Sequence, residues 1–92
     1  MKIKILYRKN LKMSTGKLAA VCCHIGKELG KVCGDTASWE DIVIVLSVSD
    51  KKFLEARQEL VYNENPYHLH IDRGFSEVSL GTDCALGWIE EM

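Results

Sequence analysis

Residues 41–48, with the sequence DIVIVLSV, decide the fold class. The run is continuous, apolar and rich in β-branched side chains. Such a run is typical of a strand that is buried on both faces, central in its sheet and often parallel to a neighbour. Helices on either side of it would make βαβ units, with the helices packed on the sheet. The run therefore predicts an α/β domain.

An amphipathic segment precedes this strand. Ser14 or Thr15 can cap a helix that begins near Gly16, and Gly30 lies where a left-handed residue would end it. The ten residues that follow, 31–40, show no clear period and are predicted to be mainly loop. The apolar positions have the spacing of one buried helical stripe. They are Leu18, Val21, Cys22, Ile25 and Leu29.

A second helix is predicted after the strand, from a cap at Ser49 or Asp50 to about Val61. Its inward-facing residues are expected to be Phe53, Leu54, Leu60 and Val61.

Three further strands are predicted outside these helices, at residues 2–7, 67–71 and 84–90. In the first, alternation puts Ile3 and Ile5 on one face. In the second, YHLHI, it puts His68 and His70 together on the face opposite Leu69. The predicted order is β-α-β-α-β-β in a single domain that covers residues 1–92.

Length and composition set limits on the class of protein. The chain has 92 residues, 47% hydrophobic and 27% charged, which is ordinary for one soluble globular domain. No apolar run approaches 18 residues, so no transmembrane helix is expected. The first ten residues, MKIKILYRKN, are too polar for a signal peptide, and their apolar run is too short. A cytoplasmic protein is therefore expected.

The four cysteines are expected to be free thiols in a reducing compartment, because Cys22 and Cys23 are adjacent within a predicted helix. A zinc site from these two with His24 and Cys33 remains an alternative, although no CxxC pair is present. Cys22 lies on the apolar stripe and is expected in the core. Cys23 points about 100° away from His24, a poor direction for a Cys–His catalytic pair.

Charge is distributed unevenly along the chain. The net charge is −1, but the first 31 residues carry eight basic groups and one acid, Glu28. A basic half beside an acidic remainder is compatible with a local phosphate-binding patch. Solvated surface lysines are the simpler alternative.

Two polar side chains share one side of the first predicted helix. Lys17 and His24 are seven residues apart, so they point almost the same way at about 10 Å along the axis. Ala20 between them leaves room for a ligand. Lys17 also lies in the first turn, where unpaired backbone N–H groups suit a phosphate or an oxyanion. An exposed lysine and a hydrogen-bonded histidine are the plain alternatives.

Asp72 ends a predicted strand and precedes Arg73 and Gly74. A carboxylate in that position is well placed to face a cleft. The alternative is an aspartate that bonds its own turn.

Together these segments resemble the type II peptidyl-tRNA hydrolases. That family carries D-L-x-M-x-x-G-K-x-A-A-x-C-x-H, and residues 10–24 read NLKMSTGKLAAVCCH. It then carries D-x-G-x-T-x-x-x-x-G-x-x-T-x-x-G. This chain has matching positions, with serine and cysteine in place of the two threonines. They are Asp72, Gly74, Ser76, Gly81, Cys84 and Gly87.

The resemblance implies a mixed four-stranded sheet and hydrolysis of the ester between peptide and tRNA, with no metal and no other cofactor. It implies catalytic roles for Lys17, His24, Asp72 and Ser76. It also implies substrate contacts for a second set, namely Lys12, Gly16, Gly74 and Cys84. The implied partners are peptidyl-tRNA and, as a homodimer, a second copy of the chain; no membrane is implied.

Two departures leave alternatives open. The segment at residues 25–41 is shorter than is usual in the family, and Cys84 offers only a weak thiol donor. The chain could therefore be a weak or inactive module that binds tRNA or a protein, or a plain interaction domain on the same scaffold.

Overall fold

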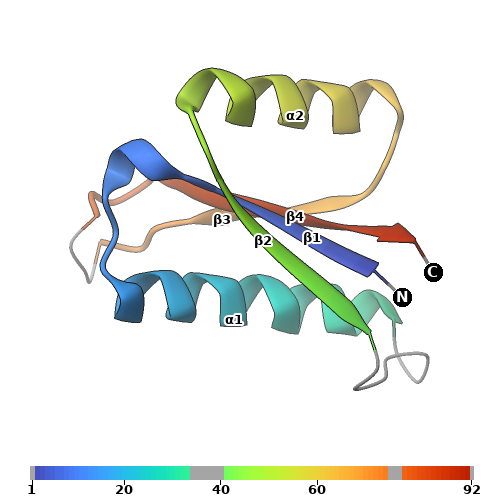
Figure 1. Cartoon of the computed structure of the whole chain (residues 1–92), viewed down its shortest axis with the longest axis horizontal. Coiled ribbons are helices and arrows are strands. Elements are labelled where there is room, and N and C mark those ends of the chain that lie inside the picture. The colour runs from blue at the N-terminus through green and yellow to red at the C-terminus, as the bar shows by residue number, and fades with distance from the viewer. Residues whose placement is uncertain (1, 34–40, 75–77, 92) are drawn as a thin grey trace.

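The computed structural model describes residues 2–33, 41–74 and 78–91, and it confirms the predicted order of elements. In Figure 1 the sheet lies between the two α-helices. A 3-10 helix (Lys9–Leu11) links the first strand to the first helix. The remaining elements are β1 (Lys2–Arg8), α1 (Thr15–Cys33), β2 (Ile42–Val48), α2 (Asp50–Tyr62), β3 (Tyr67–Ile71) and β4 (Asp83–Glu91).

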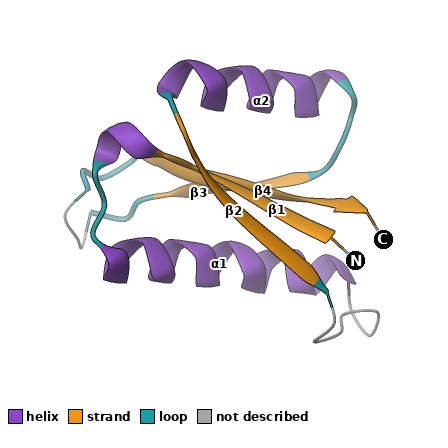
Figure 2. Cartoon of the chain, viewed as in Figure 1, coloured by secondary structure: helices purple, strands orange, loops and turns teal. Residues whose placement is uncertain are grey.

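The sheet is mixed, in the order β2-β1-β4-β3. β1 is parallel to β2 and antiparallel to β4, and β4 is antiparallel to β3. One helix lies on each side, which gives three layers (Figure 2). α1 packs on β3 and β4, whereas α2 packs on β1 and β2. The fold class predicted from the sequence is therefore confirmed.

Each helix closes its own core against one face of the sheet. On the α1 side, Ile3 and Ile5 of β1 pack with the stripe of α1, as the alternation predicted. On the α2 side, Leu6 and Leu86 pack with Phe53 and Leu60. The members of the α1-side core are Ile3, Ile5, Val21, Ile25, Leu29, Val78, Cys84 and Ala85.

Helix α1 starts as predicted and ends later than predicted. Its first turn is capped by Ser14, whose Oγ accepts the Lys17 N–H at 3.2 Å. Gly30 was expected to end the helix, but the helix continues to Cys33. A glycine inside a helix costs only about 1 kcal/mol, and Leu29 beside it is anchored in the core. In the ranges described, neither helix is long and apolar enough to cross a membrane.

Helix α2 confirms its predicted cap but only half of its predicted buried face. The Ser49 Oγ accepts the Lys52 N–H at 3.2 Å. Phe53 and Leu60 are buried, whereas Leu54 and Val61 are exposed. Each exposed residue follows a buried one by about 100°, which turns its side chain off the narrow contact with the sheet.

Strand β2 contradicts the prediction of a central strand buried on both faces. It is parallel to β1, as expected, but it is an outer strand, and most of its residues are exposed. Val43 and Val45 are in register with Ile3 and Ile5 and so share their face of the sheet. Because α1 packs over β3 and β4 instead, this apolar row extends beyond the helix that buries the β1 residues.

Gly87 on β4 allows α1 to approach the sheet closely. A Cβ atom at this position would lie 2.5 Å from Cγ2 of Ile25 and 3.2 Å from Cγ1 of Ile5. Real Cβ atoms do not make so short a contact, so the Ile25 side chain, the helix or the strand would have to shift.

Candidate functional site

The larger of two neighbouring cavities between α1 and β3 has a volume of about 730 Å³. One wall is the exposed polar side of α1, and the other is β3 with the turn that follows it. Its lining residues are Lys17, Ala20, Val21, His24, Lys27 and Glu28 from α1, and His68, Leu69, His70, Ile71, Asp72 and Arg73 from the opposite wall.

An ion pair between Lys17 and Asp72 joins the two walls. Lys17 Nζ donates to Asp72 Oδ2 at 2.5 Å, although the residues are 55 positions apart. The Asp72 side chain is 1% exposed and that of Lys17 is 15% exposed. A buried carboxylate is costly unless charge and hydrogen bonds compensate it. Lys17 supplies that charge and keeps a contact with the open cavity.

The turn after β3 fixes the Asp72 carboxylate from the other side. Gly74 has φ +82°, and its N–H donates to Asp72 Oδ1 at 2.7 Å. The Asp72 carbonyl accepts the Gly81 N–H at 2.8 Å, and the Asp72 N–H donates to the Thr82 carbonyl at 3.0 Å. A side chain at Gly74 would also meet Leu80 Cβ at 3.0 Å. The glycine therefore serves to shape the turn that holds the carboxylate.

Two histidines face each other across the middle of the cavity. The rings of His24 and His70 are stacked, with centroids 5.4 Å apart and planes inclined by 22°. Burial lowers the pKa of His70 below its ordinary value of 6.5, and the nearby charges of His24 and Lys17 lower it further. This shift favours the neutral imidazole of His70 at neutral pH.

The structure brings together three of the four residues predicted to be catalytic. Lys17, His24 and Asp72 line the same cavity. The fourth, Ser76, lies outside the described residues. These positions agree with the geometric expectation from the helix, but the roles of the residues stay predictions.

The residues predicted to bind substrate are more scattered. Gly74 contacts Asp72 directly, as described above. Gly16 is exposed in the first turn of α1, and Lys12 has φ +50° at the end of the 3-10 helix. Neither Gly16 nor Lys12 is among the residues that line the cavity.

Cys84 lies in the core rather than in the cavity wall, with 0% of its surface exposed. Its Sγ donates to the Thr82 carbonyl at 3.5 Å. Burial raises the pKa of the Cys84 thiol, and the charge of Asp72 raises it further. The thiol is thus a neutral packing group behind the ion pair. Its predicted contact with substrate stays a prediction that this burial does not support.

The other cysteines described lie apart from the site. Cys22 packs against the α1-side core, as expected, and burial raises the pKa of its thiol. Cys23 is exposed. Within the described ranges, no three His, Cys, Asp or Glu side chains are grouped to hold a metal ion.

Sequence reasoning did not assign His70 to the site. The signal was present, because strand alternation placed His68 and His70 on one face of β3. What the pattern could not show was that this face lies opposite the polar side of α1, where both histidines enter the cavity wall.

The arrangement combines a buried carboxylate with an ammonium and imidazoles that line an open cavity. A carboxylate or a neutral imidazole can accept a proton from water, and an ammonium can stabilise an oxyanion. These capacities together suit the hydrolysis of an ester.

The family model described as Peptidyl-tRNA hydrolase PTH2 matches residues 1–89 of this sequence. The match covers nearly the whole chain and confirms the resemblance found in the motifs. A search among curated proteins gives no match.

Proposed function

Because the chain belongs to the peptidyl-tRNA hydrolase family PTH2, we propose that it hydrolyses the ester between the peptide and the terminal ribose of peptidyl-tRNA. The products are a free peptide acid and a reusable tRNA. The observation that carries the proposal is the Lys17–Asp72 ion pair, which opens into a cavity that His24 also lines.

The chemistry makes demands that these residues can meet. Asp72, with His24, orients a water molecule and accepts its proton as the water oxygen attacks the ester carbonyl carbon. The Lys17 ammonium stabilises the negative charge that develops on the carbonyl oxygen. When the tetrahedral intermediate collapses, the carbon–oxygen bond to ribose breaks and the proton passes to the leaving ribose oxygen.

Two further predicted residues complete this mechanism. The Ser76 hydroxyl positions water or substrate, as the family motif implies. Gly74 contributes by holding Asp72 through its backbone N–H. This mechanism needs no metal or other cofactor.

Phosphates of the tRNA end are the proposed ligands of the basic groups around the cavity. Lys27 and Arg73 line it together with Lys17, on opposite walls. Lys12 and the exposed first turn at Gly16 lie in the basic N-terminal half, which would extend this contact. Phosphate contacts position a nucleic acid without reading its sequence. The proposal therefore requires binding that weakens as salt rises.

The second proposed partner is another copy of this chain, joined at strand β2. Its apolar residues are exposed, and as an outer strand it can pair with the same strand of a second copy about a two-fold axis. The proposed site of action is the cytoplasm, where peptidyl-tRNA arises during translation. The free thiols of Cys22, Cys23 and Cys84 agree with a reducing compartment.

The decisive experiment measures peptide release from N-acetyl-aminoacyl-tRNA. Wild-type protein should release the acyl group, and Asp72→Asn should lower kcat/KM at least about 100-fold, because the water loses its base. Asp83→Asn is the matched control, since Asp83 forms a more exposed ion pair with Arg57 at 3.3 Å. It should keep the wild-type rate.

Three outcomes would count against the proposal. Equal rates for wild type and Asp72→Asn would remove Asp72 from catalysis. Tight, salt-dependent tRNA binding without turnover by wild type would identify a binding module instead. Neither binding nor turnover would favour an interaction domain on the same scaffold.

A further inference from the structure

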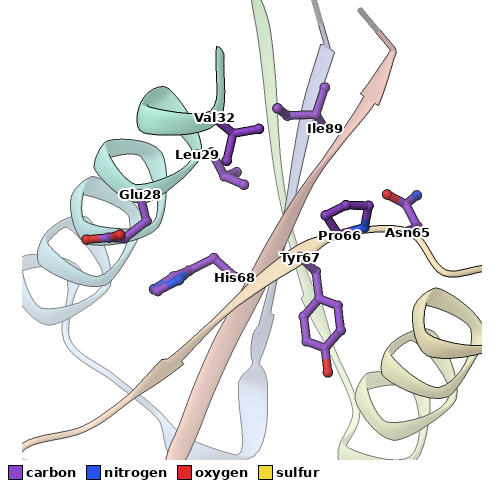
Figure 3. Close-up of a pocket in the computed structure, with 8 residues that line it drawn as sticks. All are labelled: Glu28, Leu29, Val32, Asn65, Pro66, Tyr67, His68 and Ile89. Atoms are coloured by element: carbon purple, nitrogen blue, oxygen red, sulfur yellow. The ribbon is translucent and has the colours of Figure 1, made fainter. Parts of the chain in front are cut away.

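A second, apolar cavity lies beside the candidate site, between the C-terminal part of α1 and the start of β3 (Figure 3). Its volume is about 390 Å³. Glu28 and His68 line both cavities, so the two form one groove along α1 and β3. The lining residues are Glu28, Leu29, Val32, Asn65, Pro66, Tyr67, His68 and Ile89.

The chemistry of the wall changes along the groove. The larger cavity, at the Lys17 end, is lined by three basic residues, the Asp72 carboxylate and the shared Glu28. At the other end the lining is mostly apolar, and Glu28 is the one acidic or basic lining residue there, histidine aside, in the part of the chain described. Lys31, which does not line the cavity, pairs with Glu28 at 3.1 Å, so this wall offers a polyanion no net positive charge. The apolar cavity is therefore poorly suited to RNA and well suited to an uncharged side chain.

Val32 is the exposed part of this apolar wall. The residue is 67% exposed, whereas Leu29 one turn earlier is buried in the core and forms the floor. Figure 3 shows Val32 and Leu29 together on α1, with Ile89 and Pro66 on the side of the sheet. The volume lies near the lower end of the range for small-molecule sites, roughly 300–1,000 Å³. It suits one or two aliphatic side chains.

The separation of the two cavities matches a short length of extended peptide. His24 and Val32 are eight residues apart on α1, which is about 12 Å along the axis. Asp72 and Pro66 are six residues apart along β3, which is about 20 Å. An extended chain advances about 3.3 Å per residue. A peptide that runs from the reacting ester to the apolar cavity thus spans about four to six residues.

We infer that this apolar cavity is a subsite for the peptide part of the substrate, and that it binds an aliphatic side chain four to six residues before the ester. This inference rests on the proposed function. It makes the groove directional: the tRNA end lies at Lys17 and Arg73, and the peptide runs past Glu28 and His68 towards Val32.

The test compares three tRNA esters. Two carry N-acetylated heptapeptides of Gly and Ser with either Leu-Leu or Asn-Asn at the fourth and fifth residues from the ester, and the third is N-acetyl-aminoacyl-tRNA. Wild type should show a kcat/KM about tenfold higher for the Leu-Leu substrate, a ratio typical of an aliphatic group entering an apolar pocket.

Variants then assign the preference to the cavity. Val32→Glu should abolish the preference by placing a charge in the apolar wall, and Val32→Trp should abolish it by filling the space. Both should hydrolyse N-acetyl-aminoacyl-tRNA at the wild-type rate, which also shows that they fold. Leu54→Glu, at an exposed apolar position on α2, is the matched control and should retain the preference.

The outcomes separate this inference from the proposed function. If wild type hydrolyses all three esters but treats Leu-Leu and Asn-Asn alike, the subsite is rejected and the hydrolase activity stands. A preference that survives in both Val32 variants also rejects it. If wild type hydrolyses none of the three, the proposed function and this inference fall together.

Discussion

The two outer strands of the sheet show how differently one chain can use two edges. β2 is almost entirely apolar and largely exposed, whereas β3 alternates histidines with apolar residues and is half-buried. The histidine face of β3 lies under α1 and forms one wall of the groove. The outer strand that looks like core in the sequence is exposed, and the more polar one carries the candidate site.

The reason for the difference is the unequal cover that the helices provide. α1 packs on β3 and β4 and leaves the Val43 and Val45 row of β2 beyond its reach. An apolar, β-branched run therefore predicts that a segment forms a strand. Whether that strand is buried depends on where the helices cross the sheet. The proposed chemistry therefore lies on the β3 side, and the proposed association with a second copy lies on the β2 side.

The largest expected effect is that of removing the charge of Lys17. Lys17→Met should lower kcat on N-acetyl-aminoacyl-tRNA by about 100–1,000-fold, because the oxyanion loses its donor. It should also lower the free energy of unfolding by ~3–5 kcal/mol, because buried Asp72 loses its ammonium partner. Steady-state kinetics and urea titration measure the two effects.

A control and a second variant sharpen this prediction. Lys31→Met removes an exposed lysine that pairs with Glu28 on the same helix and should leave both quantities almost unchanged. Combining Lys17→Met with Asp72→Asn should recover part of the lost stability without recovering activity. Wild-type turnover by Lys17→Met would remove Lys17 from the catalytic mechanism.

A smaller effect is expected at β2. Val43→Lys places a charge on the exposed strand and should raise the dissociation constant of the proposed dimer by at least about 100-fold. The stability of each subunit should change by less than about 0.5 kcal/mol, as for other surface substitutions. Sedimentation equilibrium measures the association. A wild-type protein that stays monomeric at high concentration would contradict the role assigned to β2.

The smallest expected effect concerns the pH dependence of stability at His70. The pKa of His70 is lowered on folding, so the unfolded chain binds the proton more readily. The contribution of His70 to the free energy of unfolding is fully present above pH 6.5. It is lost as the pH falls below 6.5 towards the folded-state pKa. His70→Gln should reduce the loss of stability between pH 7.5 and 5.5 by less than about 1 kcal/mol, because water in the open cavity screens the charges.

Urea titration of wild type and His70→Gln at the two pH values measures this difference. Ser49→Ala, which alters a helix cap without altering a titratable group, is the control and should lose stability equally at both values. A larger acid-induced loss in His70→Gln than in wild type would reverse the assigned sign.

Most of the fold could be predicted because its determinants are local. Alternation in residues 2–7 and 67–71, the stripe of α1 and the cap at Ser49 each specify an element within a few residues. The errors were those that local pattern cannot settle. The end of α1 beyond Gly30 and the exposure of β2, Leu54 and Val61 depend on which surfaces the folded chain brings into contact.

The site could be predicted only where one element carried the information. Helical spacing placed Lys17 and His24 on one side of α1, and a strand end suggested Asp72. The ion pair between Lys17 and Asp72 and the stacking of His24 on His70 join α1 to β3 across the fold. Such long-range pairs leave no signature in the spacing of residues along one helix or strand. The family motifs supply only part of the information needed to predict the site.

Gly87 has a consequence that reaches beyond the packing of β4. Because the hydrogen atom at this position lets Ile25 rest directly against the sheet, the height of α1 above the strands is fixed there. Gly87 thus helps to set the distance between the two walls of the groove, and so the thickness of a molecule that fits between them. It does so without contacting that molecule. A larger side chain at residue 87 would therefore move the two walls of the groove apart.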